Sequence, residues 1–204
     1  MNYLAHLALS GGIEEVLAGN IIEDFITGRI EHPRNAFLTE ELIVGVKLHR
    51  LIDTFTDTNE NVTNCKRLFY DSIGKYAGIV VDIFFDHFLI KNWSQFYETS
   101  LNDFCKNVYE VLPRYRTFYP KPLVKVVDSM VSHQWLTHYE YEWGLTRAMQ
   151  SVNIKIGIDN HLNEALPTFW TNYAYLNQQF LLFYPELKSM CENFIQTSIF
   201  ADEK

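Results

Sequence analysis

The chain has 204 residues, of which 15% are aromatic and 21% are charged, a composition that excludes intrinsic disorder. Seventeen Lys and Arg against 25 Asp and Glu give a formal net charge of −8, which argues against a nucleic-acid partner. Three cysteines in no C-x-x-C spacing favour reduced thiols over disulfides or a zinc-thiolate site. We therefore expect a single domain over residues 1–204, located in the cytoplasm.

Two apolar stretches, one at the N-terminus and one at 165–185, are the candidates for a signal peptide or a membrane span. The N-terminal stretch MNYLAHLALSGG has no basic region of the kind that opens a signal peptide, and it contains a histidine. The longest stretch without charged residues, 165–185, contains a proline and several amides that would leave polar groups in lipid. We expect neither a signal peptide nor a membrane span.

Apolar residues three and four positions apart recur along most of the chain and predict amphipathic helices. The expected fold class is therefore all-α. Helices are predicted at 2–9, 13–28, 39–57, 59–74, 79–90, 100–112, 121–131, 133–150, 168–184 and 186–198. Residues 78–85 (GIVVDIFF) form a β-branched run that also fits a buried strand. Pro167 is placed where proline best fits, at the start of a helix.

The predicted helix 39–57 carries a first chemical motif. His49, Asp53 and Asp57 recur every four residues, so an imidazole and two carboxylates lie in one row, a turn apart. Neutral imidazole and carboxylate oxygens converging from adjacent turns can hold a divalent cation. A solvated helix face with a His–Asp pair is the alternative interpretation.

Asp82 and Asp86 form a second motif, one turn apart inside an otherwise apolar segment. Burying an unpaired carboxylate costs several kcal/mol, so both acids need partners, and a metal or a histidine would serve. The alternative is a pair of buried acids that backbone groups and tyrosines satisfy.

A third set contains His6, Asn20 and Asp24, the last two also one turn apart. A lone histidine on an apolar face is more often a hydrogen-bonded core residue than a ligand. Together, however, two histidines and several carboxylates on separate helices are the inventory of a helical metallohydrolase, in which a cation polarises a phosphoryl oxygen and activates water. No Walker-type loop, nucleophile elbow or G-x-G-x-x-G motif competes with this interpretation.

These motifs resemble the bacterial acyl carrier protein phosphodiesterases, closely over the first half of the chain and more thinly beyond it. The segments that carry the resemblance are MNYLAHL at 1–7, Gly19-Asn20 with Asp24-Phe25, LHRLID at 48–53 with FTD at 55–57, Asp82 with DHFL at 86–89, and Trp93. Later matches are Ser132 with Trp135-Leu136 and Tyr139, and FYP at 183–185. Four motifs in the family's order, with similar spacing, make coincidence improbable.

The resemblance implies an all-helical fold distantly related to the His-Asp metal-dependent phosphohydrolases. It implies hydrolysis of the phosphodiester that joins 4'-phosphopantetheine to the serine of holo-acyl carrier protein, assisted by Mn²⁺ or Mg²⁺. The residues that it places around the metal are Asp24, His49, Asp53, Asp86 and His87. Those that it makes catalytic candidates are His6, Arg50, Asp57 and Asp82. Within that set, the planar guanidinium of Arg50 suits a non-bridging phosphate oxygen, and His6 or His87 could protonate the leaving serine oxygen.

Two further features bear on the resemblance. Glu23 stands where the family more often has a small residue, and it adds a carboxylate beside Asp24. Acyl carrier proteins are strongly acidic, so docking onto this acidic chain needs a local basic surface, and the cations of 114–125 or Lys47 and Lys66 could provide one. Two other functions stay open: a phosphohydrolase acting on a nucleotide or other small phosphoester, and a non-catalytic module that binds a carrier protein.

Overall fold

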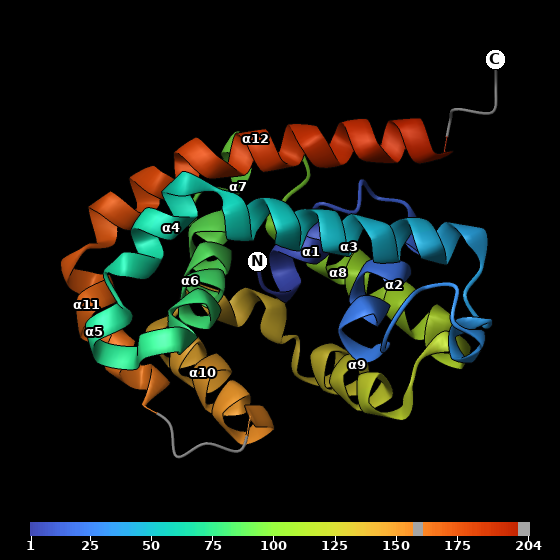
Figure 1. Ribbon diagram of the computed structural model, residues 1–204, viewed down its shortest axis with the longest axis horizontal. Coiled ribbons are helices and arrows are strands. Elements are labelled where there is room, and N and C mark those ends of the chain that lie inside the picture. The colour runs from blue at the N-terminus through green and yellow to red at the C-terminus, as the bar shows by residue number, and fades with distance from the viewer. Residues whose placement is uncertain (157–160, 200–204) are drawn as a thin grey trace.

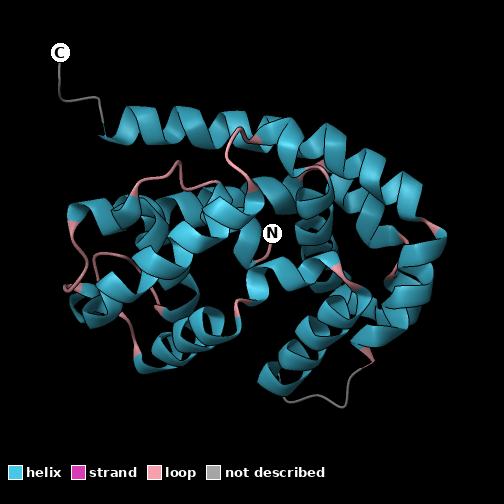
Figure 2. Ribbon diagram, turned by 180° about the vertical axis from the view of Figure 1, so that it is seen from behind, coloured by secondary structure: helices cyan, strands magenta, loops and turns pink. Residues whose placement is uncertain are grey.

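The computed structural model describes residues 1–156 and 161–199, and every regular element within these ranges is a helix (Figures 1 and 2). The α-helices are α1 (Tyr3–Ala8), α2 (Glu14–Ile22), α3 (Glu40–Thr58), α4 (Glu60–Arg67), α5 (Tyr70–Ile73), α6 (Ala77–Lys91), α7 (Trp93–Phe96), α8 (Leu101–Val111), α9 (Lys121–His133), α10 (Glu142–Ile156), α11 (Ala165–Thr171) and α12 (Tyr173–Ile199). Short 3₁₀ helices are η1 (Glu23–Phe25), η2 (Pro33–Asn35), η3 (Gly74–Tyr76), η4 (Leu112–Phe118), η5 (Trp135–Glu140) and η6 (Leu162–Glu164). The all-α prediction is confirmed.

Several predicted helices are shorter than expected. The segment 13–28 ends its α-helix at Ile22 and tightens into η1, and the segment 59–74 divides into α4 and α5. At the end of α9, Gln134 takes a left-handed conformation (φ 50°) that separates this helix from η5. Four-residue α7 was not predicted, because it is shorter than two turns and leaves almost no periodicity to detect.

The expected break at Pro185 is wrong. α12 continues through Pro185 to Ile199, although proline removes a backbone donor from the helix interior. Buried side chains on either side of the proline, Phe183, Tyr184 and Leu187, anchor both halves of the helix to the core. Packing of this apolar face therefore outweighs the local cost of the proline. Pro167 is the third residue of α11, as predicted for a proline near a helix start.

The ambiguous segment 78–85 is helical and lies within α6, the central helix of the fold. Eleven residues of α6 are buried, on all sides of the helix, which explains why its sequence shows little amphipathic periodicity. Figure 1 shows α6 within the arc formed by α4, α5, α11 and α12, with α10 below it. The carboxylate of Asp86 is thereby carried into the interior, whereas that of Asp82 stays 32% exposed.

A close crossing of α2 and α3 positions the part of the chain that contains the histidines. A Cβ atom at Gly19 would lie 2.1 Å from the carbonyl oxygen of Leu42, and one at Gly45 would lie 2.2 Å from that of Val16. Only glycine allows two backbones to approach this closely. Because Asn20 follows Gly19, and His49 lies one turn after Gly45, the crossing brings these two side chains together.

α12 covers α3 and α4 and runs beside them along one side of the molecule (Figure 1). Thr39 precedes α3, and its hydroxyl accepts a hydrogen bond from the backbone N–H of Leu42 (3.3 Å) and so caps the helix. No helix in the described ranges combines the length and the apolar character needed to cross a lipid bilayer.

Candidate metal centre

A pocket of about 220 Å³ opens where α1, α2, α3 and α6 meet. Its lining consists of Met1, Asn2, Tyr3, His6, Leu7, Asn20, Ile21, Asp24, His49, Asp53, Thr56, Asp57 and Asp82. Six of the nine site residues predicted from the sequence are in this lining. The pocket thus unites the first motif, the third set and one acid of the second motif.

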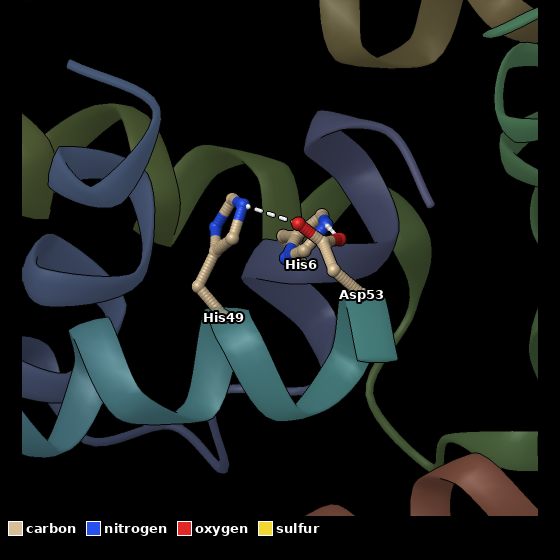
Figure 3. A group of neighbouring side chains, drawn as sticks. All are labelled: His6, His49 and Asp53. Carbon is tan, nitrogen blue, oxygen red and sulfur yellow. Dashed lines mark ion pairs between the residues drawn. The ribbon is translucent and has the colours of Figure 1, made fainter. Parts of the chain in front are cut away.

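Two stacked imidazoles form one wall of the pocket. The rings of His6 and His49 lie with their centroids 3.9 Å apart and their planes inclined by 20°. Asp53 stands between their Nε2 atoms, with Oδ1 at 3.3 Å from His6 and Oδ2 at 3.2 Å from His49 (Figure 3). One ligand atom from each of the three residues lies within 4.8 Å of the other two.

Asn20 fixes the orientation of both imidazoles. Its side-chain oxygen lies 3.0 Å from Nδ1 of His6 and 3.0 Å from Nδ1 of His49, and its backbone oxygen lies 2.8 Å from the latter. Its amide nitrogen donates to the backbone oxygen of His6 (2.8 Å) and to the hydroxyl of Ser10 (3.1 Å), so the oxygen must face the rings. Each Nδ1 therefore carries a hydrogen, so that Nε2 presents a lone pair in the neutral form of either ring.

With both rings in this tautomer, His6, His49 and Asp53 direct hydrogen-bond acceptors at one another. Two Nε2 lone pairs and a carboxylate meet at 3.2–3.3 Å, and this arrangement is unfavourable unless a positive charge lies among them. A proton can supply that charge, and so can a divalent cation. The donor set, two imidazoles oriented by hydrogen bonds at their other nitrogen and one carboxylate, can hold a divalent cation.

The ionisation of the cluster reflects this crowding. Burial lowers the pKa of His6, and the charge of nearby His49 lowers it further. Burial also acts to lower the pKa of His49, but the carboxylates of Asp53, Asp24 and Glu23 outweigh it, and the pKa rises. Burial acts to raise the pKa of Asp53, and its contacts with the two histidines reverse the direction, so that this pKa falls. The site thus keeps a carboxylate and attracts one positive charge.

A second group of possible metal ligands, Glu23 and Asp24 with His49, adjoins the first group and shares His49 with it. Oxygens of Glu23 and Asp24, both in η1, lie 3.8 Å from Nε2 of His49. One ligand atom from each of these three residues lies within 4.8 Å of the others. Arg50 donates from Nε to the other oxygen of Glu23 (2.8 Å) and from Nη2 to the backbone oxygen of Gly28 (3.2 Å). Arg50 therefore holds Glu23 toward the cluster.

Asp57 and Asp82 line the pocket but have partners of their own. Asp57 is largely exposed at the rim and accepts a hydrogen bond from Nζ of Lys66 (2.8 Å). Asp82 lies 3.0 Å from the α-amino group of Met1. Burial raises the pKa of Asp82, and the neighbouring amino group and Lys66 oppose that rise only in part.

Asp86, predicted near the metal, is directed elsewhere. It is fully buried, and its two oxygens accept hydrogen bonds from the backbone N–H groups of Leu4 (2.8 Å) and Ala5 (3.2 Å). These N–H groups belong to the first turn of α1, where an unpaired donor needs an acceptor. Burial raises the pKa of Asp86 to about 7, against the opposing effect of the two N–H groups. Asp86 is the cap of α1 and is not part of the pocket lining.

His87 also lies outside the lining. Its Nδ1 donates to the backbone oxygen of Tyr139 (2.8 Å), and its Nε2 accepts from the hydroxyl of Tyr173 (3.0 Å). The ring makes edge contacts with Phe169 and Trp170. Burial lowers its pKa, so a neutral, packed imidazole is favoured. Both ring nitrogens are engaged, and neither faces the cluster.

The structure thus gathers His6, His49, Asp53 and Asp24, places Asp57 and Asp82 at the edge of the same pocket, and uses Arg50 to hold Glu23. It adds Thr56, which the sequence did not single out, and it gives a role to Asn20, which the third set contained without one. The i, i+4 spacing of Asn20 and Asp24 was a signal for Asn20. Thr56 could have been found from its place one turn after Asp53 on the same helix face.

Comparison with known proteins agrees with the predicted resemblance. The sequence profile of the acyl carrier protein phosphodiesterase family matches residues 1–187. The chain is 28% identical over 194 residues to the acyl carrier protein phosphodiesterase of Enterobacter sp. strain 638, covering 95% of this chain and 98% of that one. It is 29% identical over 195 residues to the protein of that name from Escherichia coli O157:H7, with 92% and 95% coverage. No solved structure matches the chain. The chain therefore belongs to the acyl carrier protein phosphodiesterase family.

Proposed function

We propose that this protein hydrolyses the phosphodiester between 4'-phosphopantetheine and the serine of holo-acyl carrier protein, and that it uses a divalent cation, Mn²⁺ or Mg²⁺, to do so. Membership in the family supports the substrate. The acceptor-only cluster of His6, His49 and Asp53 supports the cation, and it is the observation on which the proposal rests. The three unpaired, buried cysteines agree with a cytoplasmic location.

In this proposal the chain supplies the ligands and their orientation. His6 and His49 would offer Nε2 and Asp53 a carboxylate oxygen, with Asp24 and Glu23 beside them on the shared histidine. Asn20 keeps both imidazoles in the tautomer that ligation requires. A bound cation would neutralise charge on a phosphoryl oxygen and lower the pKa of a water molecule. His6 thus moves from a catalytic to a ligating role, and neither Asp86 nor His87 is placed in the site.

The size of the pocket suits part of such a substrate. About 220 Å³ lies below the roughly 300–1,000 Å³ of pockets that enclose drug-sized ligands, so it can admit a phosphodiester but not a protein surface. The carrier protein would therefore rest on the surface around the opening. Because Asp24 and Asp57 stand in the lining and are themselves acidic, the attraction for an acidic partner must come from cations farther out.

The basic segment 114–125 is only partly available for this docking role. Arg114 and Arg116 each form an ion pair with a carboxylate, at 2.9 and 2.5 Å. Lys121 and Lys125, at the start of α9, form no ion pair with any described residue. These two lysines are therefore the part of the segment that we assign to docking.

Mass spectrometry of holo-acyl carrier protein, incubated with the purified protein and Mn²⁺, tests the proposal. The expected result is loss of the mass of 4'-phosphopantetheine, abolished by a chelator and by Asp53→Ala. Retention of the full mass with both Mn²⁺ and Mg²⁺ would refute the proposal. Equal turnover of a small diester such as bis(4-nitrophenyl) phosphate and of holo-carrier protein would instead favour a small phosphoester as substrate.

A further inference from the structure

Thr56 carries a hydroxyl group that the fold leaves unused. The residue is 2% exposed, and its Oγ1 has no hydrogen-bond partner among the described residues. A buried hydroxyl without a partner costs about 1–3 kcal/mol, so such groups call for a reason. Thr56 is also part of the pocket lining.

The neighbouring threonines show that this is not the default for the helix. On α3, Thr54 donates to the backbone oxygen of Arg50 and Thr58 to that of Thr54, both at 2.7 Å. Threonine in a helix usually satisfies its hydroxyl in this way, with the carbonyl four residues earlier. Thr56 stands between these two residues and does not do so, although the same kind of carbonyl lies one turn before it. The conformation of its side chain leaves the hydroxyl free for another group.

The position of Thr56 relative to the candidate metal ligands indicates which group that is. His49, Asp53 and Thr56 are spaced i, i+4 and i+7, so they lie along one face of α3. In the neutral tautomer described above, the atoms that His49 and Asp53 contribute to the cluster, Nε2 and the carboxylate oxygens, are acceptors, whereas a hydroxyl can donate. A phosphodiester has two non-bridging oxygens that carry negative charge, and a cation held by His49 and Asp53 would take at most one side of the group.

We propose that the hydroxyl of Thr56 donates a hydrogen bond to a non-bridging phosphoryl oxygen of the bound phosphodiester. This inference rests on the proposed function and adds a substrate-binding residue to it. No acceptor among the described residues competes for this donor. The hydrogen bond from a fixed donor of this kind becomes more stabilising as negative charge accumulates on the oxygen.

Binding of inorganic phosphate to the Mn²⁺-loaded protein, measured by calorimetry, tests the inference. Thr56→Val replaces the hydroxyl with a methyl group of similar size, and it should weaken phosphate binding by about 10- to 100-fold, the range for a hydrogen bond to a charged group. Thr56→Ser keeps the hydroxyl and should restore most of the binding. Thr54→Val, on the exposed side of the same helix, is the matched control and should bind phosphate as the wild type does.

Two further measurements separate the possible outcomes. Thr56→Val should unfold at the same temperature as the wild type or higher, because it removes an unpartnered buried polar group, and its affinity for Mn²⁺ should be unchanged. Unchanged phosphate binding in Thr56→Val would overturn the inference. A loss of Mn²⁺ affinity would also overturn it, by assigning the hydroxyl to the cation. If holo-carrier protein is not a substrate but phosphate binding still depends on the hydroxyl, the proposed function fails and the inference stands.

Discussion

Two helices of this protein carry similar rows of acidic and histidine side chains, and the fold uses them differently. On α3, His49 and Asp53 line a pocket and face a second histidine, His6, from α1. On α6, the carboxylate of Asp86 is occupied by two backbone N–H groups, and the imidazole of His87 by a carbonyl and a tyrosine. Spacing along a helix therefore identifies side chains that need partners. Which partners the fold supplies determines whether such a side chain belongs to the candidate site or stabilises the fold.

The largest effect should follow from breaking the α3 row. Asp53→Ala removes the carboxylate that both imidazoles share, so Mn²⁺ affinity and hydrolysis of holo-carrier protein should fall by more than about 100-fold, since even outer partners of a metal site cost 10- to 100-fold. Thermal unfolding should change little, because the side chain is about half exposed. Asp57→Ala, four residues on and paired with Lys66, is the matched control and should keep its Mn²⁺ affinity. Normal Mn²⁺ binding by Asp53→Ala would show that the cluster of His6, His49 and Asp53 is not the metal site.

The α6 row should respond in stability instead. Asp86→Ala leaves the N–H groups of Leu4 and Ala5 buried without an acceptor, and we expect a loss of about 2–4 kcal/mol in the free energy of unfolding. Asp86→Asn keeps one acceptor oxygen and should lose less. Urea denaturation measures both, and Mn²⁺ titration of the folded variants should give the wild-type affinity. A variant of Asp86 that is as stable as the wild type but does not bind Mn²⁺ would show that Asp86 is a metal ligand.

Asn20 tests the α3 site without removing a ligand, because it orients the imidazoles of His6 and His49 and is not itself a candidate ligand. Asn20→Ala frees the imidazole of His6 and leaves that of His49 held by the backbone oxygen alone, and Mn²⁺ affinity should fall by about 10- to 100-fold. Ser10→Ala removes one hydrogen-bond partner of the same amide and leaves the imidazoles held, so its affinity should be close to that of the wild type. Equal affinities for the two variants, measured by calorimetry, would contradict the role given to Asn20.

The titration of Asp86 gives a smaller, pH-dependent effect. Its pKa is raised to about 7 in the folded protein, against about 3.9 in an unfolded chain, so the folded state binds the proton more tightly. Its contribution to stability is therefore complete below about pH 4 and is lost as the pH rises toward 7. The difference in unfolding free energy between the wild type and Asp86→Asn should decrease over that interval and level off above it. A difference that grows with pH would show the opposite shift.

The smallest effect concerns docking. Reversing the charges of Lys121 and Lys125 should raise KM for holo-carrier protein roughly threefold to tenfold at low salt, with kcat unchanged, because surface charges act mainly on encounter. The difference should shrink as ionic strength increases. Steady-state kinetics at two salt concentrations would reveal it. Identical KM values and salt dependence would exclude this segment as the docking surface.

The helical fold and the α3 row could be predicted because both depend on local spacing. A helix of 19 residues fixes the relative directions of His49 and Asp53 whatever surrounds them. The burial argument for Asp86 was also correct in requiring partners. Its partners are backbone groups 82 and 81 residues away in sequence, however, and no local pattern contains that information.

The rest of the site depends on tertiary packing. His6 reaches Asp53 because α1 lies against α2 and α6, and Asn20 reaches His49 because two glycines let α2 and α3 approach closely. The continuous α12 shows the same limit, since the packing of residues on both sides of Pro185 overrides a reliable local stop signal. Sequence spacing predicted the kinds of residue in the site, and packing selected among them.

Anomalous diffraction from crystals grown with Mn²⁺ tests the central claim most directly. We predict a peak of anomalous density about 2–2.5 Å from Nε2 of His6, Nε2 of His49 and an oxygen of Asp53, the usual range for such ligands. The peak should vanish in Asp53→Ala crystals grown under the same conditions. A peak beside Asp82 or Asp86 with His6 and His49 unliganded, or no ordered Mn²⁺ in the pocket, would contradict the account.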